Sequence, residues 1–175
     1  MLDQSPPPRT QTGIPVFIWI LIGVGGLGLI GFFLAIIAAI ALPSFLTQAT
    51  KARQAEAESS LGAIIRGEQA HFLEHNRFAP SVSALNLSLP ASTSYQYALQ
   101  PQGKTAIRIT ATPLKAGLKS YTGAVFAIAQ GNEALMTTQI CESVEPSQVA
   151  PAMPTAPRTL EAAIACPPGS QPLPQ

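Results

Sequence analysis

The feature that most constrains this chain is an uncharged run of 34 residues near its start, from Gly13 to Leu46. About 20 apolar residues already span the hydrocarbon core of a bilayer, and a charge at its centre costs roughly 3 kcal/mol. A chain of 175 residues is too short to bury such a run in a core of its own. We therefore predict a retained single-pass transmembrane helix over 13–46, preceded by a disordered, Pro-rich tail over 1–12.

Small residues recur every four positions in the second half of this run, at Gly31, Ala35 and Ala39. This spacing lets two helix backbones approach closely in a membrane, although Ala-rich membrane helices also contain it by chance. We predict lateral helix packing through this segment, which continues to Pro43 and Phe45.

Beyond Pro43 the sequence predicts an α+β soluble domain. Apolar residues three and four apart, the last of them Phe72 and Leu73, predict an amphipathic helix over 47–75 with a proline kink near the membrane border. Period-two and apolar runs then predict a four-stranded antiparallel sheet, with strands near 95–99, 105–111, 124–129 and 134–141. The helix and sheet complete a domain over 47–141, and a Pro-rich C-terminal tail follows over 142–175.

Cys141 ends the fourth predicted strand, and Cys166 lies close to the C-terminus. An even cysteine count in an anchored chain favours a disulfide, which would tie the C-terminal region to the sheet. It also favours an oxidising compartment, and hence a soluble domain on the periplasmic or extracellular side of the cell membrane. The alternative is two unrelated thiols, one buried and one in the tail.

The net charge of +1 excludes no class of partner, but the charges are unevenly distributed. Five cations and no acid lie between His75 and Asn132, whereas from Glu133 onward four glutamates accompany Arg158 alone. The two regions either neutralise each other within one fold or favour head-to-tail contacts between copies.

Within the basic region, four residues are candidate contacts for an anionic polymer: Lys104, Arg108, Lys115 and Lys119. Tyr121 is the only aromatic residue between Tyr97 and Phe126, so we expect no nucleic acid recognition.

One pattern suggests catalysis: residues 71–75, HFLEH, match the zinc-protease pattern H-x-x-E-H. The only candidates for a third ligand are Glu142 and Glu145, in a Pro-rich region. We interpret the pattern as a solvated helix end, and we expect no metal, no cofactor and no enzymatic activity.

Four segments carry a resemblance to a known family: AAIALPSFL at 38–46, KARQAEA at 51–57, EQAHFLE at 68–74 and LKSYTGAVF at 118–126. Over most of residues 35–141 the chain resembles the type IV pilin-like G/H proteins of cyanobacteria. The resemblance implies a long N-terminal helix on a four-stranded antiparallel sheet, a C-terminal region often held by a disulfide, and a place in the inner membrane. It also implies pilin-like subunits, or pilus or secretion machinery, as partners.

The chain departs from the pilin pattern at the processing site. Aligned on Pro43, the glycine at which pilin precursors are cut falls on Leu21, and the glutamate of the pilin helix falls on Gly26. Gly13-Ile14 is the only plausible alternative cut. We therefore expect the protein to keep its N-terminus, either as a minor pilin or pseudopilin-like component or as a membrane-tethered binding module that does not enter filaments.

Overall fold

The computed structural model describes residues 15–130, 133–159 and 162–173, without the side chains of residues 22, 38–44 and 133. The predicted tail over 1–12 lies outside these residues. The chain divides into two units, Met1–Thr47 and Gln48–Gln175.

Helix α1, Val16–His75, is the first element of the chain. In the first unit it carries the uncharged run, and Pro43 lies within it; the predicted kink falls among residues whose side chains the structure does not describe. In the second unit it buries one stripe of side chains: Ala57, Leu61, Ile64, Ile65, Glu68 and Phe72. The prediction that Leu73 belongs to this stripe is wrong, because its side chain is 68% exposed.

The helix ends where the backbone of Asn76 turns left-handed, with φ of 53°. Its N–H donates a hydrogen bond to the carbonyl of Phe72, so the last turn is closed. A short 3₁₀ helix, η1 (Val82–Leu85), follows before the sheet begins.

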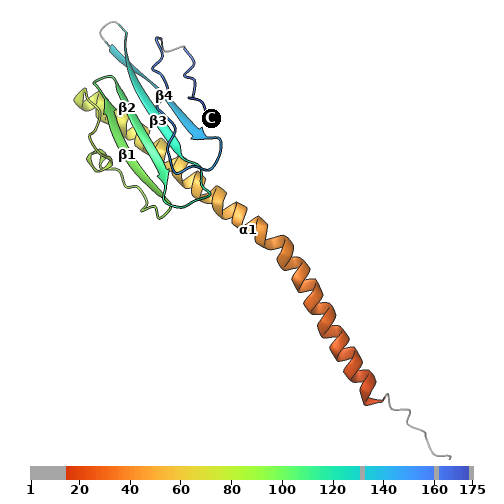
Figure 1. The fold of residues 1–175 in the computed structure, drawn as a ribbon. Helices are drawn as coiled ribbons and strands as arrows, with labels where there is room; N and C mark the ends of the chain where they lie inside the picture. The colour runs from red at the N-terminus through yellow and green to blue at the C-terminus, as the bar shows by residue number, and fades with distance from the viewer. Residues whose placement is uncertain (1–14, 131–132, 160–161, 174–175) are drawn as a thin grey trace, which may run out of the picture. The chain divides into compact units, whose positions relative to one another are not determined.

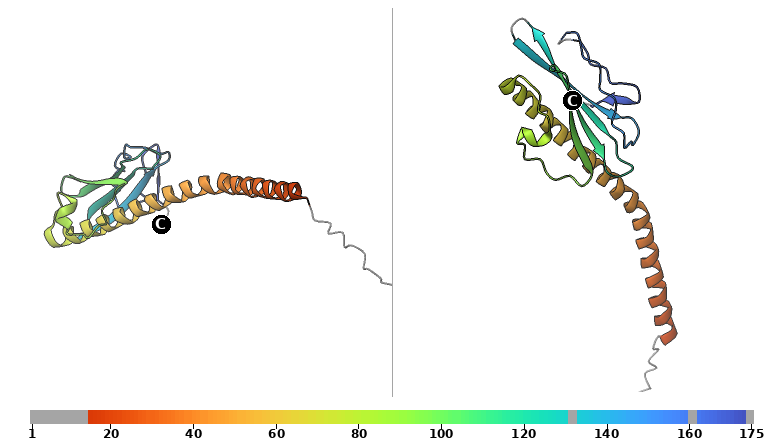
Figure 2. Two further views of the ribbon diagram at one scale, coloured as in Figure 1. Left: turned by 90° about the horizontal axis from the view of Figure 1, so that it is seen from below. Right: turned by 60° about the vertical axis from the view of Figure 1, so that its left-hand side comes forward.

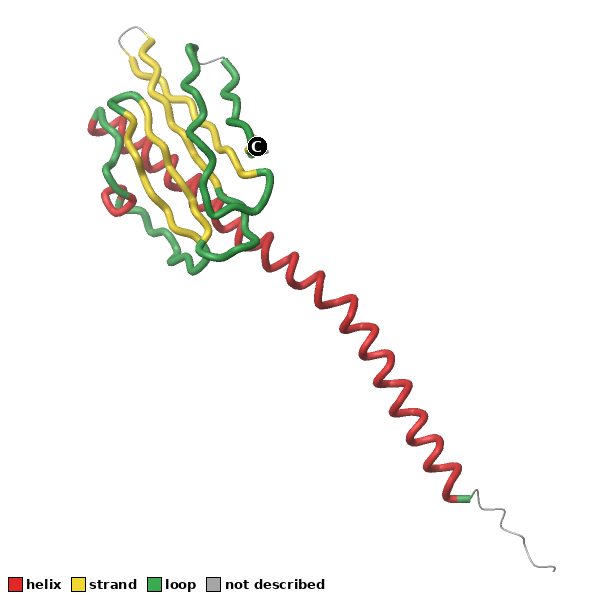
Figure 3. Tube along the Cα trace, in the orientation of Figure 1, coloured by secondary structure: helices red, strands yellow, loops and turns green. Residues whose placement is uncertain are grey.

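The sheet has five strands in the order in which they occur in the chain, and every neighbouring pair is antiparallel. The strands are β1 (Tyr95–Gln102), β2 (Ala106–Pro113), β3 (Tyr121–Gln130), β4 (Glu133–Ser143) and β5 (Ser170–Pro172). The α1 segment of the second unit packs on one face of this sheet (Figures 1 and 3). The α+β class is confirmed, but the predicted count of four strands is wrong because β5 joins the edge of β4.

Strand β3 begins at Tyr121, three residues before its predicted start. The reason is Gly123, which lacks a side chain to continue the alternation but lies in the strand. A Cβ at Gly123 would be 3.0 Å from Cδ1 of Ile65, so glycine allows α1 to approach the sheet closely here.

Both faces of the central strands are buried. Ile107, Ile109 and Val125 face α1 in the hydrophobic core, and each is 0% exposed. Phe126, on the opposite face, is only 3% exposed. The Pro-rich C-terminal segment lies on the side of the sheet away from α1 (Figure 2), and Pro154 within it is buried. The sequence predicts a Pro-rich tail that a disulfide ties to the sheet, and the structure adds that this segment forms a third layer on the sheet and contributes strand β5.

Candidate functional site

The apolar part of α1 is exposed along its whole described length. Residues Val16–Ile37 form a 22-residue segment of mean hydropathy 2.6, none of it buried by the rest of the protein. At 1.5 Å per residue it is about 33 Å long, enough to cross the hydrocarbon core. The side chains of Trp19 and Phe32 are both 63% exposed, which is unfavourable in water and favourable in lipid. This helix could therefore span a membrane.

The residues predicted to pack helices together lie on this helix. Gly31 and Ala35 are exposed, and apart from the adjacent helix backbone no described atom lies within 4 Å of the position that a Cβ on Gly31 would occupy. Phe45 is 69% exposed. Ala39 and Pro43 are helical, but their side chains lie outside the described part of the structure. The packing role of this stripe therefore stays a prediction.

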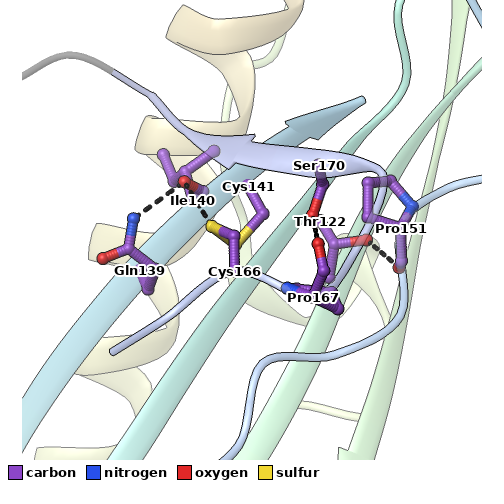
Figure 4. Close-up of a disulfide and its surroundings, with 8 residues drawn as sticks. All are labelled: Thr122, Gln139, Ile140, Cys141, Pro151, Cys166, Pro167 and Ser170. Carbon is purple, nitrogen blue, oxygen red and sulfur yellow. Dashed lines mark hydrogen bonds between the residues drawn. A yellow bond between two sulfur atoms is a disulfide. The ribbon is translucent and has the colours of Figure 1, made fainter. Parts of the chain in front are cut away.

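The disulfide predicted between Cys141 and Cys166 is confirmed. It joins the end of β4 to the C-terminal segment, with the two Cα atoms 5.7 Å apart (Figure 4). Cys141 is fully buried on the face of β4 opposite α1. The bond therefore fixes the C-terminal segment against this face, directly before β5 begins.

Hydrogen bonds fasten the same segment to β2 and β3. The carbonyl oxygen of Pro151 accepts from Nη2 of Arg108 at 2.8 Å and from the hydroxyl of Thr122 at 2.6 Å (Figure 4 shows the second). The hydroxyl of Ser120 donates to the carbonyl of Val149 at 2.7 Å. Proline has no N–H but keeps a carbonyl oxygen that accepts hydrogen bonds. A Pro-rich segment can therefore be held by hydrogen-bond donors on the sheet.

An ion pair closes the β4–β5 edge. Nζ of Lys119 lies 3.1 Å from Oε1 of Glu142, and both side chains are largely buried. The side-chain amide of Gln171 donates to the same carboxylate oxygen from β5. The basic region and the acidic region of the sequence thus neutralise each other at this one pair within the fold.

The four candidate polymer contacts do not gather at one place. Lys119 is paired with Glu142, and Arg108 is committed to Pro151. Lys104 lies in the turn before β2 and Lys115 follows the end of β2, so the whole strand separates these two exposed residues. At about 3.3 Å per residue, the strand alone keeps them about 26 Å or more apart. Polymer contact through these four residues stays a prediction.

The H-x-x-E-H residues lie at the C-terminal end of α1. The rings of His71 and His75 stack with their centroids 4.2 Å apart, and Nδ1 of His75 lies 3.1 Å from the carbonyl oxygen of His71. Glu74 is exposed. Among the residues that the structure describes, no group of three or more His, Cys, Asp or Glu side chains could hold a metal ion.

A buried carboxylate at Glu68 was not singled out by the sequence reasoning. The residue is 0% exposed, and Oε2 accepts a hydrogen bond from the N–H of Ala79 at 2.9 Å. Oε1 is buried without a hydrogen-bond partner in the described structure. Burial raises the pKa of Glu68 to about 6, and the hydrogen bond from Ala79 lowers the pKa by a smaller amount. The spacing of Leu61, Ile64, Glu68 and Phe72 at helical intervals was the signal that could have placed it inside.

Two buried tyrosines connect the helix, the sheet and the loop before β3. The hydroxyl of Tyr121 donates to Oε1 of Glu58 on α1 at 3.1 Å, and that of Tyr95 donates to the carbonyl of Lys119 at 2.9 Å. Burial raises the pKa of both, that of Tyr95 to about 12. Both hydroxyls therefore stay protonated and act as structural donors.

The family model described as Type IV pilin-like G and H matches residues 54–167, which include the end of α1, the strands β1 to β4 and both cysteines. Neither the search of curated proteins nor the search of solved structures found a match.

Proposed function

The chain belongs to the type IV pilin-like G and H family, and from this premise we propose that it is a structural, non-enzymatic subunit of a type IV pilus or a type II secretion-like system. In this role it is a minor pilin or pseudopilin-like protein. The observation that carries the proposal is the pairing of one exposed apolar helix segment, Val16–Ile37, with a family-matched α+β unit. Its partners are then other pilin-like subunits and the machinery that assembles them.

The disulfide supports a location for the second unit. Disulfides persist in oxidising compartments and are rare in the cytosol. The Cys141–Cys166 bond is therefore consistent with a single-pass protein of the inner membrane whose α+β unit lies on the periplasmic or extracellular side. We keep this side as part of the proposal.

In-cell cross-linking of the full-length protein tests this role. Cells expressing the wild-type chain are treated with a membrane-impermeant amine cross-linker, and the partners joined to it are identified by mass spectrometry. We expect pilin-like subunits among these partners. We also expect that a thiol-alkylating reagent modifies neither cysteine until the protein has been reduced. Recovery of the chain only as an uncross-linked membrane protein, with free thiols, would overturn both the role and the location.

The alternative of a polymer-binding module has no observation of its own in its favour. Two of its four basic residues are engaged within the protein and the other two are far apart, as described above. It remains the outcome to consider if the cross-linking finds no pilin-like partner.

A further inference from the structure

Exposed lysines lie on one side of the sheet, and the exposed Glu145 lies on the other. Lys104 and Lys115 flank β2, on the β1 side of the sheet. Glu133 begins β4 and Glu145 follows its end, on the other side. In the described part of the chain, neither lysine nor Glu145 forms an ion pair. The ion pair that joins the basic and acidic regions is between Lys119 and Glu142. These charges are therefore left to interact with another molecule.

The backbone of β4 presents an open edge beside its acidic end. The carbonyl of Ile140 accepts a hydrogen bond from the N–H of Leu173, and the N–H of Val144 donates to the carbonyl of Gly169. The backbone N–H and C=O groups of the even-numbered residues of β4 therefore point toward β5. Backbone groups alternate in direction along an antiparallel strand, so the same outward direction applies to those of Ala134, Met136 and Thr138.

Strand β5 is too short to cover these residues. It pairs only with residues 141–143, and no described residue hydrogen-bonds the outward backbone of residues 134–138. The sequence from 134 to 140, ALMTTQI, has no charge and no proline, which are the usual protections of a strand edge. A further strand can add here.

The outer edge of β1 is open in the matching way. The carbonyl of Thr105 accepts the N–H of Ala127 from β3, so even-numbered residues of β2 face β1. The outward backbone groups of β1 then belong to its odd-numbered residues, Tyr97 and Leu99 among them. Pro101 has no N–H and limits pairing to the residues before it. No described residue hydrogen-bonds the outward backbone of Tyr97 or Leu99.

We propose that β1 of one copy pairs antiparallel with the open edge of β4 in a second copy, under the attraction of their opposite charges. This inference rests on the proposed function, for which it names a contact between subunits. The register that sets Leu99 opposite Met136 of the second copy also sets Tyr97 opposite Thr138. Leu99 and Met136 are both partly buried residues that pack against the helix-side core, so the apolar face continues from one copy to the next.

The charges fit this register at both ends of the strands. The end of β1 comes beside the start of β4 in the second copy, which brings the backbone of Lys104 near that of Glu133. At the other end, Lys115 lies toward Glu145 of the second copy. The contact joins two different edges, so it is heterologous and each copy keeps one edge open for the next. Such a contact extends an assembly in one direction, as a filament subunit requires.

Charge-swapped variants of the full chain test the contact. Wild-type protein is labelled at its amino terminus with a donor or an acceptor dye and reconstituted in phosphatidylcholine vesicles, and association is measured by energy transfer at increasing dilution in lipid. Lys104→Glu with Lys115→Glu gives two acidic edges, and Glu133→Lys with Glu145→Lys gives two basic edges. We expect each variant alone to associate about tenfold more weakly, because like charges then face each other.

Mixing the two variants in equal amounts should restore wild-type association, since every contact then joins an acidic edge to a basic one. This rescue also shows that both variants are folded. Arg66→Glu with Arg77→Glu is the control for Lys104→Glu with Lys115→Glu, because both arginines are exposed outside the strands and the change in net charge is the same. It should associate like the wild type.

The edge contact is overturned if the swapped variants associate like the wild type, if their mixture is not rescued, or if the wild type does not associate. The proposed function is decided separately, by the cross-linking to pilin-like subunits in cells. Cross-linking to such subunits together with insensitive charge variants would therefore retain the function and remove only this contact.

Discussion

Glu68 gives the stability of this fold a pH-dependent contribution. Its carboxyl is buried with one hydrogen bond, from Ala79, and burial raises its pKa from 4.5 to about 6. The folded state therefore holds the proton more tightly than the unfolded chain does. The stabilisation is fully present below pH 4.5 and is lost as the pH rises through 6. The loss is about 2 kcal/mol, from 1.36 kcal/mol for each pKa unit.

We expect Glu68→Gln to remove this dependence, because glutamine keeps an acceptor for the N–H of Ala79 and has no proton to lose. The free energy of unfolding of the variant, measured in denaturant on the detergent-solubilised chain, should change little between pH 4.5 and 7. At pH 7 it should exceed that of the wild type. Glu74→Gln, on the exposed side of the same helix, is the control and should behave as the wild type. An unchanged pH slope in Glu68→Gln would contradict the assignment.

At the scale of elements, the C-terminal segment is held by a few identified contacts rather than by regular structure. The disulfide closes a sequence separation of 25 residues, and β5 adds only three residues to the sheet. Closing a loop of this length stabilises the fold by about 3 kcal/mol on the chain-entropy account. The covalent bond therefore adds to the hydrogen bonds and the β5 pairing that hold this layer on the sheet.

The double substitution Cys141→Ser with Cys166→Ser should lower the free energy of unfolding by about 3 kcal/mol. It should also speed hydrogen exchange across residues 144–166 and at Phe126, whose face the segment covers. The wild type treated with a thiol reductant under native conditions provides a comparison without substitutions. Unchanged exchange in both samples would mean that the hydrogen bonds to Pro151 and Val149 hold the layer without the disulfide.

The apolar part of α1 offers a matched pair of glycines for testing lateral packing. Gly31 and Gly26 both have open space where a Cβ would lie, but they are about 140° apart around the helix. If Gly31 lies at a helix–helix contact, Gly31→Leu should weaken association in vesicles by about 1 kcal/mol, or fivefold. Gly26→Leu should have little effect. Equal effects of the two substitutions would mean that the predicted stripe makes no specific contact.

Local patterns predicted some of these elements and could not predict others. The spacing of Leu61, Ile64, Ile65 and Phe72 predicts the buried helix stripe because a 3.6-residue period depends only on the helix itself. Strand β5 has no such signal: Ser-Gln-Pro is a poor strand sequence, and it pairs because the disulfide delivers it to an open edge. The early start of β3 depends on the fit of Gly123 against Ile65, which is a tertiary contact.

At the scale of the whole molecule, the sequence predicts the components and the structure supplies the spatial relations within the second unit. The excess of lysine and arginine in one region and of glutamate in another is visible in the sequence. Only the strand order shows that Lys119 and Glu142 neutralise each other while Lys104, Lys115 and Glu145 stay exposed on opposite sides of the sheet. A chain with a membrane-length helix and two unlike sheet edges is suited to joining copies of itself.

The most direct test of the central claim, that this protein is a pilin-like subunit, is the mass of its N-terminal peptide in native membranes and in sheared filaments. We expect the peptide in both fractions, because a subunit passes from the membrane into the filament. A start at Ile14, or a methylated start within the apolar run, would add that the chain is processed as pilins are. A peptide that begins at Met1 or Leu2 and occurs only in the membrane fraction would contradict the account and indicate a fixed membrane protein.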